Sequence, residues 1–96
     1  MAFGRKPALV SQHGYVEGRV QSVAFRFYTR QEATQLQLRG WVMNLADGRV
    51  EFHVQGEASS VAEFLEWLRR GPTLAMVQGV QVEAADPEDL TEFEIR

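Results

Sequence analysis

The sequence predicts an α+β fold of two layers, in which an antiparallel sheet carries two helices on one face. Strand-like and helix-like segments follow one another in the order strand, helix, strand, strand, helix, strand, with a short strand added at the end. The 96 residues, 45% of them hydrophobic, are enough for one core and too few for two. Two helices cannot cover both faces of a small sheet, so we expect them to share one face.

The first strand is expected near the start of the chain. Residues 1–8 show no periodicity and should form a flexible N-terminal tail, which leaves residues 9–96 as a single domain. From about Leu9 to Glu17, apolar residues lie between polar ones in a modest strand pattern, and Gly18 is expected to end this strand.

The first helix is expected from Ser22 to about Leu38, because this stretch lacks Gly and Pro and is rich in helix-forming residues. Its apolar stripe is imperfect, and we expect Val23, Phe27 and Leu38 to share its buried side. The Ser22 hydroxyl suits an N-cap. Gly40 is expected to stop the helix.

The next segments predict a hairpin. Residues 41–45 have strand character, and Asp47 and Gly48 then form a strong hairpin signal. In residues 50–54 apolar and polar side chains alternate with a period of two, so one face should be buried. By the same alternation we expect His53 on the exposed face.

The second helix has the clearest periodicity of the chain, with apolar residues at i, i+3, i+4 and i+7 within 61–68. Ser60 and Glu63 have the spacing of a capping box at its start. Gly71 and Pro72 are typical of a helix end.

The remaining segments complete the predicted topology. Residues 76–84 alternate as a fourth strand, residues 86–89 are expected to form a solvated acidic loop, and Phe93 and Ile95 indicate a short last strand. This order predicts a ferredoxin-like two-layer sandwich, βαββαβ with a short extra C-terminal strand.

The turn between the first strand and the first helix has the features of an anion site. Backbone N–H groups at the start of a helix lack intrahelical partners, and the helix dipole places partial positive charge there. Arg26 falls one turn into the helix, and its guanidinium can bind two phosphate oxygens at once. The turn and Arg26 together predict a phosphoryl site.

Two long motifs resemble the signatures of the acylphosphatase family. The first comprises residues 18–26 with Tyr28, Thr29, Glu32 and Ala33, and the second comprises residues 40–51. Segments within 56–77 and the closing residues 93–96 also follow the family pattern. The resemblance covers nearly all of the chain after about Gln12.

The resemblance implies a small monomeric enzyme that hydrolyses the carboxyl–phosphate anhydride of acyl phosphates, with neither metal nor cofactor. It implies Arg26 and Asn44 as catalytic residues, with Arg26 on the phosphate and Asn44 on the attacking water. Phosphate binding is expected from the residues of the turn, namely Gly18, Arg19, Val20, Gln21, Ser22, Val23 and Arg26. Thr29 is expected to support the site rather than to touch substrate.

Ser22 departs from the family pattern, which has a glycine at this position. If its φ is positive, serine costs about 1–2 kcal/mol in strain; alternatively, its hydroxyl offers the phosphate an extra donor. A weak or inactive phosphate-binding relative is therefore one alternative, and a nucleic-acid-binding module of the same fold is a less favoured one.

Composition restricts the remaining function classes. The chain has no Cys and a formal net charge of −3, which excludes disulfides and thiolate sites and argues against nucleic-acid or membrane partners. His13 and His53 fall on different strands and do not form a metal pair. No signal peptide or membrane span is apparent, so we expect a cytoplasmic protein that acts on a small-molecule substrate.

Overall fold

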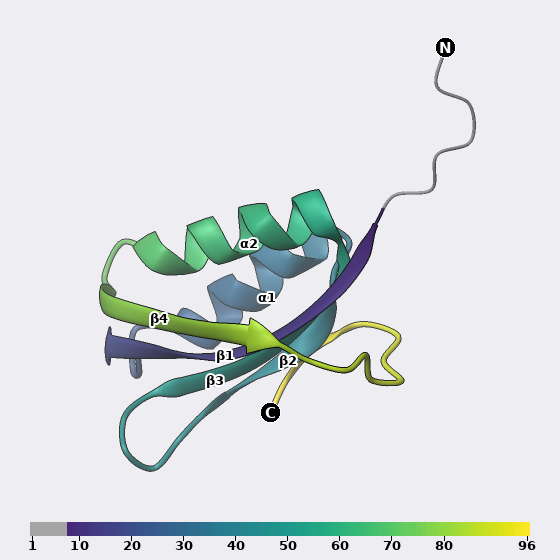
Figure 1. The fold of residues 1–96 in the computed structure, drawn as a ribbon. Coiled ribbons are helices and arrows are strands. Elements are labelled where there is room, and N and C mark those ends of the chain that lie inside the picture. The colour runs from purple at the N-terminus through teal and green to yellow at the C-terminus, as the bar shows by residue number, and fades with distance from the viewer. Residues whose placement is uncertain (1–7) are drawn as a thin grey trace.

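The computed structural model describes residues 8–96, so residues 1–7 of the predicted N-terminal tail lie outside the described part. The elements are, in chain order, β1 (Leu9–Arg19), α1 (Phe25–Gln35), β2 (Arg39–Asn44), β3 (Val50–Glu57), α2 (Ala58–Arg70), β4 (Met76–Ala84) and β5 (Phe93–Ile95). Figure 1 shows both helices on one side of the sheet.

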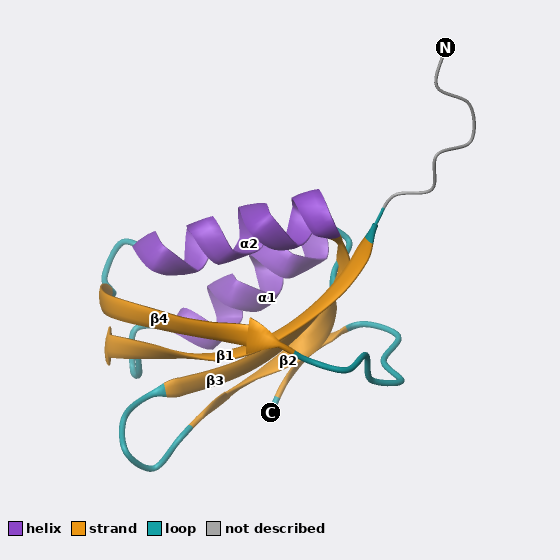
Figure 2. Ribbon diagram, in the orientation of Figure 1, coloured by secondary structure: helices purple, strands orange, loops and turns teal. Residues whose placement is uncertain are grey.

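The strands form one sheet in the order β4-β1-β3-β2-β5. β1 pairs antiparallel with β3 and β4, and β2 pairs antiparallel with β3. The short β5 adds to the edge of β2 and runs parallel to it, so the sheet is mixed rather than wholly antiparallel as predicted. Figure 2 shows the resulting two layers, and the ferredoxin-like α+β prediction is confirmed.

The core lies between the helices and the sheet. α2 contributes Val61, Phe64 and Leu68, as its periodicity predicts, and all three are at most 2% exposed. On the sheet, the alternation predicted for β3 is confirmed, because Val50, Phe52 and Val54 are fully buried. Burial of such side chains stabilises the fold by roughly 1.5–3 kcal/mol each.

The buried side of α1 differs from the prediction. Phe25, Thr29 and Ala33 face the core, whereas Phe27 is 50% exposed and Val23 precedes the helix. At about 100° per residue, Phe27 lies nearly opposite Phe25 around the helix, so burial of the Phe25 side leaves Phe27 exposed.

Neither predicted helix cap is formed. Ala24 is the N-cap of α1, so Ser22 lies outside the helix. α2 begins at Ala58 with Glu57 as its N-cap, so Ser60 is already inside the first turn and the predicted capping box is wrong. The chain passes from β3 directly into α2, and Ala58 N–H donates to Ala8 O (2.8 Å).

β1 extends beyond the predicted end at Gly18 as far as Arg19, because a register shift between Glu17 and Gly18 lets its pairing with β4 continue. Gly18 has φ 126°, and a Cβ there would lie 2.1 Å from Met76 O. The glycine thus allows the strand to bend toward the turn without losing its partner.

His53 is buried, at 1% exposure, contrary to the prediction for its strand face. The Trp41 ring stacks on it (centroids 6.2 Å, 16° between planes), and Glu88 Oε2 lies 3.4 Å from His53 Nδ1. The same carboxylate accepts a hydrogen bond from Trp41 Nε1 (3.0 Å). Residues 86–89 are all exposed, as predicted for an acidic loop, and Glu88 joins this loop to the face of the sheet away from the helices.

Glycines in two neighbouring strands provide a test of sheet packing. A Cβ on Gly14 would lie 2.0 Å from Gln81 O and 2.8 Å from Phe52 Cζ, whereas a Cβ on Gly79 would meet nothing within 4 Å. We expect Gly14→Ala to lower the free energy of unfolding by about 1–3 kcal/mol or more. Urea denaturation measures this change.

Gly79→Ala is the matched control. It should leave the free energy of unfolding unchanged or raise it by up to about 1 kcal/mol, because alanine loses less conformational entropy than glycine. Equal effects of the two substitutions would contradict the register of β1 against β4.

Candidate active site

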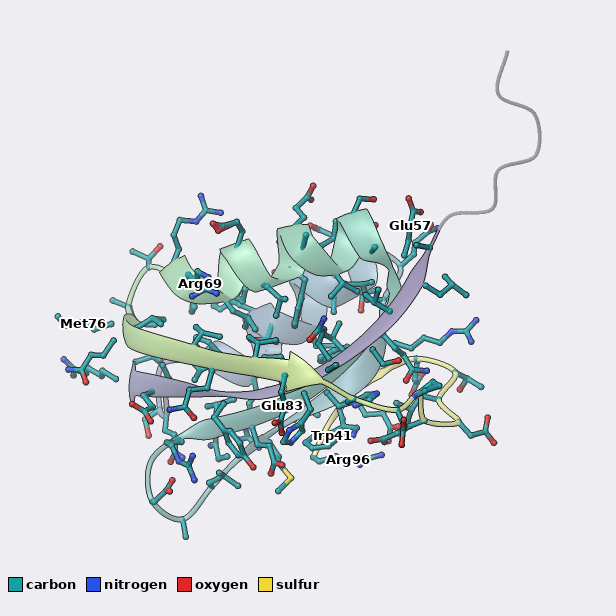
Figure 3. The ribbon with its side chains drawn as sticks, viewed as in Figure 1. Trp41, Glu57, Arg69, Met76, Glu83 and Arg96 are labelled. Atoms are coloured by element: carbon teal, nitrogen blue, oxygen red, sulfur yellow. The ribbon has the colours of Figure 1, made fainter. Side chains whose placement is uncertain are left out.

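The predicted site residues gather at one end of the molecule. The end of β1, the connection to α1, the hairpin between β2 and β3, and the start of β4 all lie at the left in Figure 1. Figure 3 shows Met76 projecting outward at this end, from the start of β4. The ends of these separate segments therefore lie at the same end of the molecule.

A pocket of about 210 Å³ opens between the β1–α1 turn and the end of β2. Arg26 and Asn44 both line it, together with Val20, Gln21 and Ser22 of the turn. Its remaining lining residues are Ala24, Phe25, Phe27 and Ile95. The fold therefore brings Arg26 and Asn44, from different elements, to one small pocket.

The turn has an unusual backbone conformation. Ser22 (φ 61°) and Ala24 (φ 58°) both lie in the left-handed region, which L-residues other than Gly adopt at a cost. Such turns direct successive N–H groups to the same side and form concavities that bind anions. Tyr28 N–H donates to Ala24 O (3.1 Å), so the N–H groups ahead of it have no partner within α1.

Arg26 is half-buried, and its guanidinium is hydrogen-bonded to the backbone of Arg96. Its Nη1 donates to the backbone oxygen of Arg96 (3.1 Å), and Arg96 N–H donates to Val42 O (2.8 Å). The Arg96 guanidinium in turn lies over the Trp41 ring, 5.1 Å from its centroid, and Figure 3 shows the two side by side. One end of the Arg26 guanidinium is thereby oriented by the sheet edge.

Asn44 is the last residue of β2 and lies opposite Val50. Its Oδ1 is buried and has no hydrogen-bond partner among the described residues. A half-turn of the carboxamide exchanges Oδ1 with Nδ2, so either an acceptor or a donor can be presented to a molecule in the pocket.

Gln21 has a role that the sequence did not indicate. Its side-chain Nε2 donates to both Leu45 O (2.8 Å) and Arg49 O (2.9 Å). These two carbonyls belong to the β2–β3 hairpin: Leu45 directly follows Asn44, and Arg49 directly precedes β3. Gln21 therefore connects the turn to the strand end that carries Asn44.

Other predicted phosphate-binding residues lie outside the pocket lining. Gly18 and Arg19 are in β1, paired with Val77 and Met76 of β4. Val23 lines a neighbouring groove instead.

Four lining residues were missed by sequence reasoning, namely Ala24, Phe25, Phe27 and Ile95. Ile95 belongs to the closing motif that resembles the family, and this was a signal that could have placed it at the site. Thr29 is fully buried in α1 and does not line the pocket, in keeping with a supporting role.

The pocket holds positive charge without a group that titrates near neutral pH. Arg26 is its one ionisable lining residue, and a guanidinium stays protonated throughout this range. Among residues 8–96, no three His, Asp or Glu side chains are grouped so that they could hold a metal ion.

At the apex of the nearby hairpin, the Arg49 backbone N–H and guanidinium hold the pKa of Asp47 below its usual value of 3.8. A lowered carboxyl pKa stabilises the fold above the pKa of the unfolded state. That stabilisation is lost only as the pH falls through the lower folded-state pKa, so at neutral pH it is constant.

A family model and curated relatives identify the family of this chain. The family model described as Acylphosphatase matches residues 12–95. Two curated relatives named Acylphosphatase are similar over most of their lengths. The one from Pseudomonas paraeruginosa is 49% identical over 93% of this chain and 98% of the relative. The one from Trichormus variabilis is 48% identical over 92% of this chain and 87% of the relative.

A solved structure has the same fold. The structure of an acylphosphatase from Coxiella burnetii superimposes with a TM-score of 0.89 at 42% sequence identity, covering 92% of this chain and 93% of that one. In the described residues, no helix is long and apolar enough to cross a membrane.

The positive φ of Ser22 leads to a stability prediction. Ser22→Gly removes the Cβ strain of about 1–2 kcal/mol but adds about 0.5–1 kcal/mol of unfolded-state entropy. We therefore expect the free energy of unfolding to rise by up to about 1.5 kcal/mol, as measured by urea denaturation.

Ser11→Gly, in the extended backbone of β1, is the control and should lower the free energy of unfolding. A loss of stability in Ser22→Gly as large as that in Ser11→Gly would contradict the strain at Ser22.

Proposed function

This chain belongs to the acylphosphatase family, and on that premise we propose that its small pocket holds the phosphoryl group of an acyl phosphate between Arg26 and Asn44. Its activity is the hydrolysis of acyl phosphates to a carboxylate and inorganic phosphate. One observation carries the assignment of the site: Arg26 from α1 and Asn44 from β2 line the same pocket as the left-handed turn at residues 20–24.

The turn and Arg26 bind the phosphoryl oxygens. Phosphoryl transfer passes through a loose transition state whose charge is spread over the equatorial oxygens, so positioning and electrostatics provide most of the catalysis. The backbone N–H groups of the turn supply fixed donors, and the Arg26 guanidinium supplies a planar pair of donors. They place positive potential where a metal ion acts in other phosphoryl-transfer enzymes, so the reaction is metal-independent.

Arg26 is already oriented before substrate arrives. Its Nη1 donates to the Arg96 backbone oxygen, so only part of the guanidinium has to find new acceptors on the phosphate. Preorganised donors cost no reorganisation during the reaction, which makes each of them more effective than a mobile side chain.

Asn44 positions the attacking water through its carboxamide. The water oxygen forms a bond to phosphorus while the bond from phosphorus to the bridging oxygen breaks, and the electron pair leaves with the carboxylate. An oxygen of the substrate's own phosphate takes the water's proton, because Asn44 has no basic nitrogen and no other lining residue is a base at neutral pH. The carboxylate is a good leaving group and needs no general acid.

Two alternative functions have less support from the structure. A phosphate-binding relative with weak turnover is favoured only by the strained Ser22, which replaces the glycine of the family pattern. A nucleic-acid module would require exposed aromatic rings on the open sheet face. Phe52 and Phe93 instead lie in the core, and Trp41 is 8% exposed beneath the loop that carries Glu88.

The charge and the substrate of the enzyme bear on its location and its binding partners. We propose a monomer in the cytoplasm that acts on a small molecule and binds neither nucleic acid nor membrane. The net charge of −3 supports this assignment, because binders of polyanions usually carry a basic face.

Activity assays test the site. The purified chain should hydrolyse a synthetic aryl acyl phosphate in excess chelator. Arg26→Lys and Asn44→Ala should each lower kcat/KM by about 10²–10³, the usual effect of losing one well-placed donor. Lysine fails because a compact ammonium cannot replace the planar fork of the guanidinium.

Arg30→Lys is the matched control, because Arg30 is an exposed arginine in the same helix that does not line the pocket. It should retain the wild-type kcat/KM. A near-normal rate for Arg26→Lys would refute the role of Arg26, and loss of activity in chelator would refute the metal-independent mechanism.

The pH dependence tests the identity of the proton acceptor. We expect kcat to vary little between about pH 6 and 8, because no side chain titrates in the chemical step. A bell-shaped profile centred near the pKa of a histidine would show that a protein base takes part. His13→Gln and His53→Gln would then identify which histidine it is.

A further inference from the structure

A second, larger hollow adjoins the phosphate pocket. This groove of about 730 Å³ runs between α1, the end of α2 and the loop that follows α2. Ser22 and Ala24 line both hollows, so residues 22–24 form the wall between them. A molecule whose phosphoryl group lies in the small pocket can therefore extend over this wall into the groove.

The groove lining includes the polar residues Gln31, Gln35 and Thr73, and the rest of it suits an apolar group. Tyr28 and Leu74 are 42% and 72% exposed, so large apolar side chains face solvent at its edge. Trp67 and Pro72 add further apolar surface on the α2 side. Contact with a ligand would remove this surface from water, which is favourable in proportion to the area buried.

The charge of the groove favours neutral ligands over ligands with a second carboxylate. Glu32 is the single charged residue among its lining side chains. A ligand with a second carboxylate would meet this like charge in a partly enclosed space, which raises its free energy. A neutral ligand meets no such penalty.

The position of the groove matches the leaving group. Attack on phosphorus is in line, so the departing carboxylate lies opposite the attacking water. Asn44, which positions the water, lines the phosphate pocket but not the groove. The groove is reached across the Ser22–Ala24 wall instead, where an acyl group opposite the water would extend.

We propose that the groove between α1 and α2 is the acyl-binding site and that the preferred substrates are acyl phosphates with a neutral aromatic or branched aliphatic acyl group. This inference rests on the proposed function. Tyr28 and Leu74 contact the acyl group, and Glu32 discriminates against acyl groups that carry a second carboxylate.

Binding of stable analogues tests the preference without turnover. The analogues are phosphonates in which a methylene replaces the bridging oxygen of the acyl phosphate. Calorimetry measures the Kd of phenacylphosphonate, which carries a phenyl group, and that of 2-oxopropylphosphonate, which carries a methyl group. We expect the phenyl compound to bind about tenfold more tightly to the wild-type chain. In Leu74→Ser and Tyr28→Ser this ratio should fall to about two or less.

Leu9→Ser is the matched control, because Leu9 is 78% exposed at the far end of β1 and lines neither hollow. It should keep the wild-type ratio. Equal binding of the two compounds to the wild-type chain, or an unchanged ratio in both groove variants, would overturn the inference.

Charge is tested with the acyl phosphates themselves. Glu32→Gln should raise kcat/KM for succinyl phosphate by about three- to tenfold relative to that for benzoyl phosphate. An unchanged ratio would refute the role of Glu32. If the wild-type chain hydrolyses acyl phosphates but shows no acyl preference, the inference alone fails. If it neither hydrolyses them nor binds either phosphonate, the proposed function fails and the inference falls with it.

Discussion

The backbone conformation of residues 20–24 is the constraint on which the site depends. Two residues in the left-handed region, Ser22 and Ala24, reverse the chain between β1 and α1. This conformation is costly for residues with a Cβ, and it persists because the flanking residues are fixed. Val20 and Phe25, on either side of the reversal, are at most 2% exposed. The core thus holds both ends of a turn that would not adopt this shape by itself.

The hydrogen bonds of Gln21 extend this constraint across the pocket. One side-chain nitrogen joins the turn to two carbonyls of the β2–β3 hairpin, so the turn and the strand end that carries Asn44 are held together. Arg26 is oriented from the opposite side by the backbone of Arg96 at the edge of β2. Each reactive group is therefore positioned by a contact far away in sequence, which is how preorganisation is obtained in a small domain.

Sequence periodicity predicted the elements whose burial depends on local pattern alone. The apolar positions of α2 and the alternation in β3 are examples, and both are confirmed. Sequence periodicity gave wrong predictions where tertiary contacts determine which side chains are buried. The predicted face of α1 was wrong because the packing of Phe25, Thr29 and Ala33 against the core determines the buried side, and the weak apolar stripe does not indicate that packing. His53 was assigned to solvent because alternation cannot show that a loop distant in sequence covers the far face of the sheet.

The site was predicted less by spacing than by resemblance. A glycine before a helix and an arginine in its first turn are common features, and only the two long motifs distinguished Arg26 and Asn44 from ordinary surface residues. The pocket shared by Arg26 and Asn44 depends on the pairing of β2 with β3 and on the hydrogen bonds that Gln21 donates to the hairpin. Neither feature follows from the order of residues. The groove between α1 and α2 likewise arises from the packing of segments that are separate in sequence.

Titration of the isotope-labelled chain with inorganic phosphate, followed by NMR, tests the central claim most directly. The account predicts saturable shifts of the backbone N–H signals of residues 20–26 and of the Arg26 guanidinium, and their loss in Arg26→Ala. Shifts confined to other parts of the surface, or unchanged binding in Arg26→Ala, would contradict it.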